Sequence, residues 1–502
     1  MKLDADLQSI QEARNMVQEA REAQRLVEGM DQSRIDAIVK NMAQAAESEA
    51  GRLAVLAVEE TGFGKADDKR IKNVFAARDV YDAIKDMKTV GIVSRDDIRK
   101  VWEIAQPFGV IAGIVPSTNP TSTVIYKSLI AVKARNAIVF SPHPAARRCS
   151  AEAAEVMQRA AEQAGAPSGL VQCLTLPSMT ATNELMKHPS TDLILATGGS
   201  AMVEAAYSSG KPAYGVGPGN VPVYVHASAN IQEAVRRILE SKTFDFGTIC
   251  ASEQALVVDA EVKSEFVATC LRQGAYLLDE QEKQKVSAVI MNGKGLNPSI
   301  VGRSPQVIGE LSGISVPEDA RVLIAEETNI GSGYPFSAEK LSPLLALYTV
   351  NDWQEGCRIC MQLLAFGGMG HTLGIHCENE AVIESFGLEK PASRIVVNAG
   401  TTFGAIGATT GIMPSLTLGC GSYGHNITSD NIGPRHLMNL KRVAFGLKEM
   451  RLERAAVGYE TRRADEGNRQ EAQPADNGAS LGISREEVLD IIKSVLAEMK
   501  TS

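Results

Sequence analysis

Val110-Ile-Ala-Gly-Ile-Val115 is a short apolar run rich in β-branched residues, and it is the first of several along the chain. Similar runs occupy Ala137–Phe140, Leu193–Ala196 and Val221–Val225, and segments with a helical pattern such as Ala151–Ala164 lie between them. Strands that alternate with helices are typical of a mostly parallel sheet whose faces are covered by helices. The sequence therefore predicts an α/β fold.

A second series of alternating segments lies further along the chain. Strand patterns cover Ala255–Val258, Val322–Ala325, Leu345–Val350 and Ile395–Val397, and Val262–Gln273 has a helical pattern. One hydrophobic core seldom serves a chain of 502 residues. Two α/β domains are therefore predicted, and a cleft between domains is a common place for a ligand site.

Composition excludes several classes of function. The formal net charge is -9 at pH 7, whereas binding to nucleic acid or to an anionic membrane surface needs basic patches. No apolar run approaches the roughly 18 residues that span a bilayer, and the first residues lack the apolar core of a signal peptide. Eight cysteines without framework spacing fit a reducing cytosol. A cytoplasmic protein that binds neither nucleic acid nor membrane is expected.

The C-terminal part of the sequence changes character. Residues 451–483 are rich in charged and small residues, which predicts a flexible linker. Ser484-Arg-Glu-Glu487 is a capping box, and apolar residues at 488, 491, 492, 495, 496 and 499 then form one stripe of an amphipathic helix over 484–502. A short helix on a disordered tether is marginal alone, so it should dock on its own chain or on a partner protein.

Phe244-Asp-Phe-Gly-Thr-Ile-Cys250-Ala-Ser-Glu-Gln254 places a cysteine in a short glycine-containing turn with small neighbours. A thiol does covalent chemistry only where it is accessible and can ionise, and such a turn exposes it. The ordinary alternative is a buried structural thiol. That role is assigned to the other cysteines, including Cys357 and Cys360 of the one C-x-x-C motif, because no second pair completes a zinc site. No metal is expected.

Six segments in the same order resemble the CoA-acylating aldehyde dehydrogenases, from about Ala13 to Lys448. The Cys250 segment resembles the nucleophile segment of that family. The other five are Ile114-Val-Pro-Ser-Thr-Asn119-Pro-Thr-Ser-Thr, Ala196-Thr-Gly-Gly-Ser200, Glu339-Lys-Leu-Ser-Pro343, Gly370-His371-Thr372 and Pro414-Ser-Leu-Thr-Leu-Gly-Cys-Gly421.

The resemblance implies an aldehyde dehydrogenase-like fold and a homodimer or homotetramer. It implies a Rossmann-like NAD- and CoA-binding domain over 1–244 and a catalytic domain over 245–425. A returning oligomerisation segment over 426–450 then precedes the linker and the terminal helix.

The resemblance also implies roles for the matching residues. Cys250 attacks the aldehyde, while the Asn119 amide and the Cys250 backbone N–H stabilise the oxyanion, each donor being worth about 3 kcal/mol. NAD would lie against Thr197, Gly198, Gly199 and Ser200, with Glu339 at the nicotinamide ribose and Pro142 and His143 near the adenosine.

The residues alone leave alternatives to these roles. A Gly-Gly-Ser turn is a weak signal of a dinucleotide site, and Asn119 before Pro120 is also a turn former. Glu339 is equally consistent with a solvated carboxylate. His371, in a glycine-rich segment expected to be flexible, either assists thiol deprotonation near neutral pH or is bonded to backbone.

The segment Tyr214-Gly-Val216-Gly-Pro-Gly-Asn-Val-Pro222 decides between two reactions. Aldehyde dehydrogenases that hydrolyse their acyl-enzyme carry a glutamate in the matching segment, and this chain has Gly215 and Val216 there. Without that base, the thioester waits for a better nucleophile, the thiol of coenzyme A. The expected reaction converts propionaldehyde or acetaldehyde, CoA and NAD⁺ to acyl-CoA and NADH.

Several other functions stay open. A sulfoacetaldehyde-specific acylating dehydrogenase and a hydrolytic dehydrogenase keep the fold, and a γ-glutamyl-phosphate-reductase-like enzyme is more distant. Residues 484–502 resemble the encapsulation peptides that target enzymes to bacterial microcompartments. That resemblance implies a shell protein as partner and a location inside such a compartment. A non-catalytic shell adaptor is the alternative from another class.

Overall fold

The computed structural model describes residues 4–293 and 295–450. The chain separates into two units, Met1–Gly446 and Leu447–Ser502, and the first contains every helix and strand given below. The linker predicted over 451–483 and the helix predicted over 484–502 lie outside the described residues. Within the described ranges, no helix combines the length and apolar character needed to cross a membrane.

The first sheet has five parallel strands, as the alternating pattern predicts. Its two central strands are covered on both faces, which explains why their sequences read as continuous apolar runs. The carboxyl ends of parallel strands meet at one edge of a sheet, where ligands commonly bind. The strand order is β5 (Val171–Cys173), β4 (Ala137–Pro142), β3 (Val110–Val115), β6 (Leu193–Thr197) and β7 (Ala213–Val216).

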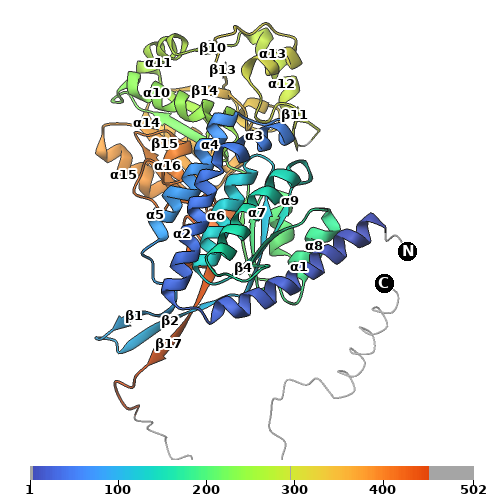
Figure 1. Ribbon diagram of the computed structural model, residues 1–502. Helices are drawn as coiled ribbons and strands as arrows, with labels where there is room; N and C mark the ends of the chain where they lie inside the picture. Colours follow the sequence, from blue (N-terminus) through green and yellow to red (C-terminus); the bar gives the residue numbers. More distant parts are fainter. Residues whose placement is uncertain (1–3, 294, 451–502) are drawn as a thin grey trace, which may run out of the picture. The chain divides into compact units, whose positions relative to one another are not determined.

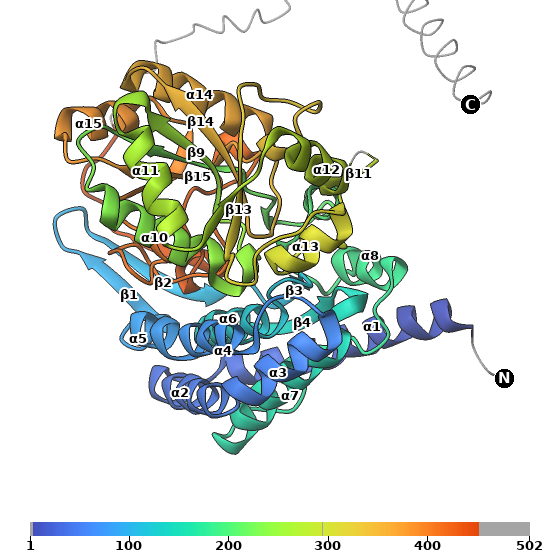
Figure 2. The same cartoon turned by 90° about the horizontal axis from the view of Figure 1, so that it is seen from above.

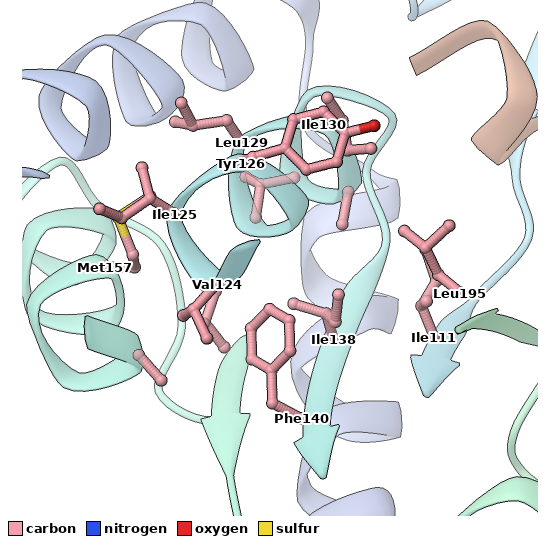
Figure 3. Packing of buried hydrophobic residues seen from close by; sticks show 14 of the residues in the cluster. Ile111, Val124, Ile125, Tyr126, Leu129, Ile130, Ile138, Phe140, Met157 and Leu195 are labelled. Carbon is pink, nitrogen blue, oxygen red and sulfur yellow. The ribbon is translucent and has the colours of Figure 1, made fainter. Parts of the chain in front are cut away.

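Helix α6 (Pro120–Lys133) is buried along its whole length and packs on β3, β4 and α7. Figure 3 shows its side chains gathered in one apolar cluster with Ile138 and Phe140 of β4. A helix that is buried on all sides is held firmly, so the loop at its N-terminus is held as well. The other helices of this part are α1 (Ala5–Glu28), α2 (Gln32–Ser48), α3 (Ala50–Thr61), α4 (Ala66–Val74), α5 (Val80–Ile84), α7 (Arg147–Gln163), α8 (Met179–Lys187) and α9 (Ser200–Tyr207).

The second sheet has seven parallel strands. Its order is β10 (Ala275–Leu277), β13 (Val322–Glu326), β14 (Leu344–Val350), β9 (Glu253–Asp259), β8 (Val221–Val225), β15 (Gly370–His376) and β16 (Ala392–Val397). In Figure 2 this sheet, with α10 (Ile231–Thr243), α11 (Ala260–Arg272) and α14 (Trp353–Phe366), lies on one side of the first unit, and the first sheet lies on the other. The remaining helices are α12 (Glu280–Ile290), α13 (Pro305–Ser312), α15 (Glu380–Glu389) and α16 (Thr401–Ala405).

Two sequence expectations about these strands are wrong. The run Val221–Val225 was grouped with the first series, but as β8 it pairs with β9 and β15 of the second sheet. The segment at His371 was expected to be flexible, but it forms the buried strand β15. A Cβ on Gly370 would lie 1.9 Å from the Cys420 carbonyl oxygen, so this glycine permits a close approach of two backbones.

A third sheet was not predicted from the sequence. It is antiparallel and contains β1 (Gly91–Asp96), β2 (Val101–Pro107) and β17 (Met438–Ala444), with β2 in the centre. Strand β17 returns from the end of the first unit to pair with β2, and Figure 1 shows the sheet extending away from the helices around it. Two short strands, β11 (Met291–Asn292) and β12 (Gly295–Leu296), form a separate antiparallel pair.

Candidate active site

Cys250 lies in the turn between a short 3-10 helix, Phe244–Gly247, and strand β9. The backbone N–H of Ser252 donates to the Ile249 carbonyl oxygen at 2.9 Å, which closes the turn. All eight cysteines lie in the described residues, and Cys250 is the one that is partly accessible, while the other seven are buried. The one partly exposed cysteine is therefore the residue that the sequence singles out as the nucleophile.

The surroundings of Cys250 keep its thiol protonated at neutral pH. Burial, followed by the negative charge of Glu339, raises the pKa of Cys250 to about 12, and the positive charge of Arg394 opposes this shift. A thiol reacts with a carbonyl carbon as its thiolate. The chemistry therefore needs a group that takes the proton or a positive charge that approaches the sulfur.

Glu339 is tied to the backbone that approaches Cys250. Its Oε1 accepts a hydrogen bond from the Gly219 N–H at 3.0 Å, and the next residue, Lys340, donates its backbone N–H to Gln254 Oε1 at 3.1 Å. Burial raises the pKa of Glu339 to about 7, against the Gly219 N–H and the charge of Lys242. A fully solvated carboxylate, the alternative reading of Glu339, does not fit these contacts.

Gly219 brings Cys250 and His371 together. A Cβ at this glycine would lie 2.4 Å from the Cys250 carbonyl oxygen and 3.1 Å from Cγ of the His371 ring. No other residue type fits there without moving backbone. The crossing from β7 to β8 therefore passes directly against the nucleophile turn.

His371 is a buried neutral histidine in β15, the strand next to the edge strand β16 of the second sheet. Burial, followed by the positive charge of Arg394, lowers the pKa of His371 to about 3. Its Nδ1 is 2.9 Å from Thr372 Oγ1, and its buried Nε2 has no hydrogen-bond partner among the described residues. The expectation that His371 titrates near neutrality is wrong, because the surrounding strands exclude water from the ring.

The Asn119 side chain reaches across to the nucleophile turn. Asn119 precedes α6 but does not cap it with its side chain. Instead, Nδ2 donates to the Thr248 carbonyl oxygen at 3.2 Å and to Thr118 Oγ1 at 3.1 Å, while Oδ1 accepts from Lys72 Nζ. Asn119 is thus more than a turn former. Its amide contacts Thr248, which is two residues before Cys250 in the chain.

The predicted dinucleotide turn lies where β6 ends and α9 begins. Thr197 pairs with Val216 in the sheet, and Gly199 is the residue before the first turn of α9. A Cβ at Gly199 would meet nothing within 4 Å, so the approach to the helix N-terminus is open. The buried Thr197 Oγ1 has no hydrogen-bond partner among the residues that the structure describes. An open helix N-terminus with free backbone N–H groups suits a pyrophosphate.

Pro142 and His143 lie at the same edge of the first sheet. Pro142 ends β4, and the exposed His143 accepts a hydrogen bond at Nδ1 from the Ala145 N–H at 3.2 Å. The histidine ring therefore has a structural role in the turn before α7, and its other face stays accessible to a ligand.

A cavity of about 560 Å³ is lined in part by the first residues of α7, which follow His143 closely in the sequence. In the described part of the chain, the guanidinium groups of Arg147 and Arg148 have neither a hydrogen bond nor an ion pair. Arg52, across the cavity, is paired with Glu49 and Glu152. Guanidinium groups bind phosphate oxygens in bidentate fashion, so this cavity suits a phosphate group. It is lined by Arg52, Leu56, Arg147, Arg148, Ala151, Glu152, Thr175 and Leu176.

A second cavity, of about 340 Å³, extends from the surface to Lys72. Its wall is mainly apolar, which suits a short alkyl chain. Two arginines, Arg70 and Arg78, also contribute to the wall, and Arg78 is paired with Glu47 at 3.4 Å. The lining residues are Arg70, Ile71, Lys72, Val74, Phe75, Arg78, Asp79, Phe244, Phe403, Ile406 and Ala408.

At Gly215, one of the two positions that match the glutamate of hydrolytic relatives, the structure leaves little room for a side chain. A Cβ at Gly215 would lie 2.8 Å from Val203 Cγ1 and 3.0 Å from Tyr207 Cε2. The Tyr207 hydroxyl also accepts a hydrogen bond from the Gly215 N–H at 3.0 Å, and Val216 is buried. The end of β7 therefore offers no carboxylate to activate water.

Sequence reasoning missed the buried lysines of α4. Lys69 and Lys72 share one face of that helix and contact Asp245, just before the nucleophile turn. Asp245 stands inside the quoted cysteine segment, but nothing in the sequence indicates that lysines more than 170 residues away pair with it. Within residues 4–293 and 295–450, no group of three or more His, Cys, Asp or Glu side chains is placed to hold a metal ion.

Comparison with known proteins agrees with this geometry. The sequence profile of the aldehyde dehydrogenase family matches residues 4–292. An acetylating aldehyde dehydrogenase from Geobacillus thermoglucosidasius is 64% identical, with a TM-score of 0.89 over 90% of this chain and 100% of that one. The bifunctional aldehyde-alcohol dehydrogenase AdhE of Escherichia coli is 45% identical over 447 residues, 88% of this chain and 50% of that protein. The chain thus spans about half the length of the curated aldehyde-alcohol dehydrogenases that it matches.

The chain belongs to the aldehyde dehydrogenase family, in its acylating, CoA-dependent branch. The prediction of an oxidoreductase of this class with an aldehyde dehydrogenase-like α/β fold is confirmed. A more distant structure, that of Rhodopseudomonas palustris propionaldehyde dehydrogenase, contains bound CoA and an acylated cysteine. It is 26% identical, with a TM-score of 0.77 over 86% of this chain and 97% of that one.

Proposed function

We propose that the chain catalyses the reversible reaction of a short aldehyde, CoA and NAD⁺ to give acyl-CoA and NADH. The observation that carries this proposal is a contrast between two positions. Cys250, the one partly exposed cysteine, lies beside Asn119 and Glu339, whereas the positions that match the hydrolytic glutamate are Gly215 and Val216, neither of which carries a carboxylate. An acyl group on this cysteine lacks a water-activating base from β7, and a thiol is a better nucleophile than water.

The proposed chemistry proceeds through two tetrahedral species. The Cys250 thiolate forms a C–S bond to the aldehyde carbon, and the carbonyl oxygen becomes an oxyanion. Asn119 Nδ2 and the Cys250 backbone N–H donate to this oxygen. The hydrogen bond from Nδ2 to the oxyanion replaces one of its bonds to Thr248 or Thr118. A dinucleotide held at Thr197–Ser200 would accept the hydride that leaves this carbon when the oxyanion collapses to the thioester. The CoA thiolate then attacks the thioester and Cys250 departs as thiolate.

Two groups control the proton on Cys250. Glu339 is the carboxylate that raises the pKa of the thiol most, and its own pKa of about 7 suits a proton acceptor at neutral pH. The resemblance assigns Glu339 to the nicotinamide ribose instead. The positive ring of an oxidised nicotinamide would itself favour the thiolate. The variant Glu339→Gln separates the role of proton acceptor from the role of ribose ligand.

The substrate is proposed to be acetaldehyde or propionaldehyde, because the wall of the 340 Å³ cavity beside Lys72 is mainly apolar. Sulfoacetaldehyde is a second candidate, since Arg70 lines the same cavity and has no hydrogen bond or ion pair among the described residues. Comparing kcat/KM for the three aldehydes in the wild type and in Arg70→Ala separates the candidates. A selective loss for sulfoacetaldehyde would favour the sulfonate substrate.

The test of the reaction mixes purified protein with propionaldehyde and NAD⁺, with and without CoA, and follows NADH absorbance and acyl products. Sustained NADH formation that depends on CoA, together with propionyl-CoA, supports the proposal. Sustained turnover without CoA points to the hydrolytic dehydrogenase. A protein without turnover under any condition, and a Cys250→Ala variant with an unchanged cellular phenotype, would point to the shell adaptor.

The cellular location is proposed from residues 484–502 alone, which lie outside the described residues. Their resemblance to encapsulation peptides favours a shell protein as partner and a place inside a bacterial microcompartment. Removing residues 484–502 is expected to leave activity in solution intact and to abolish co-purification with shells. Loss of activity on removal would show instead that the segment docks on the catalytic part of its own chain.

A homodimer or homotetramer is proposed because β17 is an edge strand with exposed apolar side chains. Leu440 is exposed on β17 and Phe445 is exposed just beyond its end, and an unpaired edge is a template for a second chain. Light scattering after size-exclusion chromatography measures the mass directly. A monomer at micromolar concentration would contradict this assignment.

A further inference from the structure

Two lysines of α4 are buried against the turn that precedes the nucleophile. Lys69 and Lys72 each have side chains that are 3% exposed, and both ammonium groups donate to Asp245 Oδ2. Lys69 Nζ also donates to the Thr118 carbonyl oxygen at 2.9 Å. Lys72 Nζ donates to Asn119 Oδ1 and to Thr248 Oγ1, the latter at 3.3 Å. Buried ammonium groups are costly unless they are paired, so this arrangement calls for a reason.

Asp245 holds the two lysines in place at a backbone cost. Its side chain is fully buried and also accepts from the Lys65 N–H at 2.7 Å and from Thr248 Oγ1 at 2.7 Å. Asp245 and Phe246 have φ angles of 48° and 51°, in the left-handed region that disfavours residues with a Cβ. Such strain persists where the surroundings impose it, and it is concentrated at functional sites.

The Asn119 amide has two orientations of nearly equal shape, because its oxygen and its nitrogen exchange places on rotation by 180°. An ammonium group only donates, so Lys72 requires the amide oxygen on its side. A carbonyl oxygen only accepts, so Thr248 requires the amide nitrogen on the other side. These two contacts select the orientation in which the N–H groups face the nucleophile turn.

We propose that Lys72 is a positioning residue for the oxyanion donor, acting through Asn119. Its ammonium group fixes the orientation of the amide and draws electron density from the N–H groups that would meet the oxyanion. A hydrogen bond polarised in this way is stronger inside a protein than in water. This inference rests on the proposed function and adds to it a residue that does not touch substrate.

The cluster of Lys69, Lys72 and Asp245 carries more positive than negative charge. Two ammonium groups face one carboxylate, and burial is the largest effect that lowers the pKa of Lys72, to about 8, with the charge of Asp245 opposing it. A net positive charge behind Asn119 favours negative charge in front of it. The negative charge on the substrate oxygen develops only in the transition state. The contribution of Lys72 is therefore expected in kcat rather than in substrate binding.

The test replaces Lys72 with methionine, which keeps the length of the side chain and removes its charge and donors. Acyl-CoA formation should lose about 10- to 100-fold in kcat, a loss like that found for residues that orient metal ligands, with little change in the KM for aldehyde. Lys69→Met is the matched control, because it removes a charge from the same carboxylate without touching Asn119. Its loss should be clearly smaller.

A double-mutant cycle separates positioning from a general structural effect. In an Asn119→Ala background, Lys72→Met should cause no further loss of kcat, because the residue it acts through is absent. Losses that multiply, or a Lys69→Met loss equal to that of Lys72→Met, would overturn the inference. Lys72→Gln keeps a donor toward Asn119 and should recover part of kcat, and it replaces Lys72→Met if circular dichroism shows that the methionine variant is unfolded.

Measurements on the wild-type protein distinguish failure of the proposed function from failure of the positioning role of Lys72. If the wild-type protein shows no CoA-dependent turnover, the proposed function fails, and the positioning role that rests on it fails as well. If the wild type turns over with CoA and Lys72→Met retains full kcat, only the positioning role fails.

Discussion

Asn119 Nδ2 donates a hydrogen bond to the carbonyl oxygen of Thr248 at 3.2 Å, across 129 residues of sequence. This bond joins the loop after β3 of the first sheet to the turn that precedes β9 of the second sheet. The amide therefore belongs to the surroundings of Cys250 rather than to its own helix, which supports the proposal that it donates to an oxyanion on the substrate.

Replacing Asn119 with alanine is expected to lower kcat for acyl-CoA formation by about 10²- to 10³-fold, which is the usual cost of losing one oxyanion donor. The KM for aldehyde should change little, because the donor acts on charge that develops during the reaction. Steady-state kinetics with saturating CoA and NAD⁺ measure both quantities. A variant with raised KM and unchanged kcat would show that Asn119 serves only in binding.

Alkylation should label Cys250 before any other cysteine, because the remaining seven are buried. Iodoacetamide treatment of the folded protein, followed by peptide mass spectrometry, gives the order of labelling. The rate should keep rising with pH well beyond the range of an ordinary thiol, since the pKa of Cys250 is raised to about 12. A rate that levels off near pH 8 would contradict the burial of this thiol.

Replacing Glu339 with glutamine removes the negative charge that raises the pKa of Cys250. The pKa should fall, so alkylation of Cys250 at pH 8 should become faster than in the wild type. Kinetics then separate the two roles proposed for Glu339. A proton acceptor predicts a large loss of kcat, whereas a ribose ligand predicts a raised KM for NAD⁺ with a smaller loss of kcat.

Replacing Arg147 and Arg148 together with alanine should raise the KM for a cosubstrate that carries a phosphate on its ribose. Comparison of CoA with 3′-dephospho-CoA, and of NADP⁺ with NAD⁺, shows which cosubstrate uses the cavity. Arg159→Ala is the matched control, because Arg159 lies on the same helix and pairs with Glu155. Equal effects of the double variant on all four cosubstrates would exclude a phosphate site in this cavity.

His371 should make the fold sensitive to acid. Its pKa is lowered to about 3 in the folded protein, below the value of about 6.5 expected in the unfolded chain. Stability from this group is therefore fully present above pH 6.5 and is lost as pH falls toward 3, by up to about 1.4 kcal/mol per pH unit. Urea unfolding at pH 7 and pH 5 should show a smaller loss for His371→Asn than for the wild type. An equal loss would mean that protonation of this ring does not contribute.

Much of the fold was predictable because strand and helix patterns are local. The apolar runs at Val110–Val115 and Ala137–Phe140 become β3 and β4, since a strand covered on both faces must be apolar throughout. The pattern does not reveal which sheet a strand joins, so β8 was assigned to the wrong series. The strands β1, β2 and β17 are partly exposed and lack a strong pattern, and pairing between residues 101 and 444 depends on long-range contacts.

The candidate site was also predictable only in part. The sequence by itself determined which cysteine stands in a turn, that no carboxylate occupies positions 215 and 216, and which motifs follow one another, because these are properties of neighbouring residues. Only the tertiary structure decided that His371 is buried and neutral, that Asn119 faces Thr248, and that Lys72 is held between Asp245 and Asn119. Burial and hydrogen-bond partners depend on the packing of segments far apart in the chain, and they set the charge and the orientation of each reacting group.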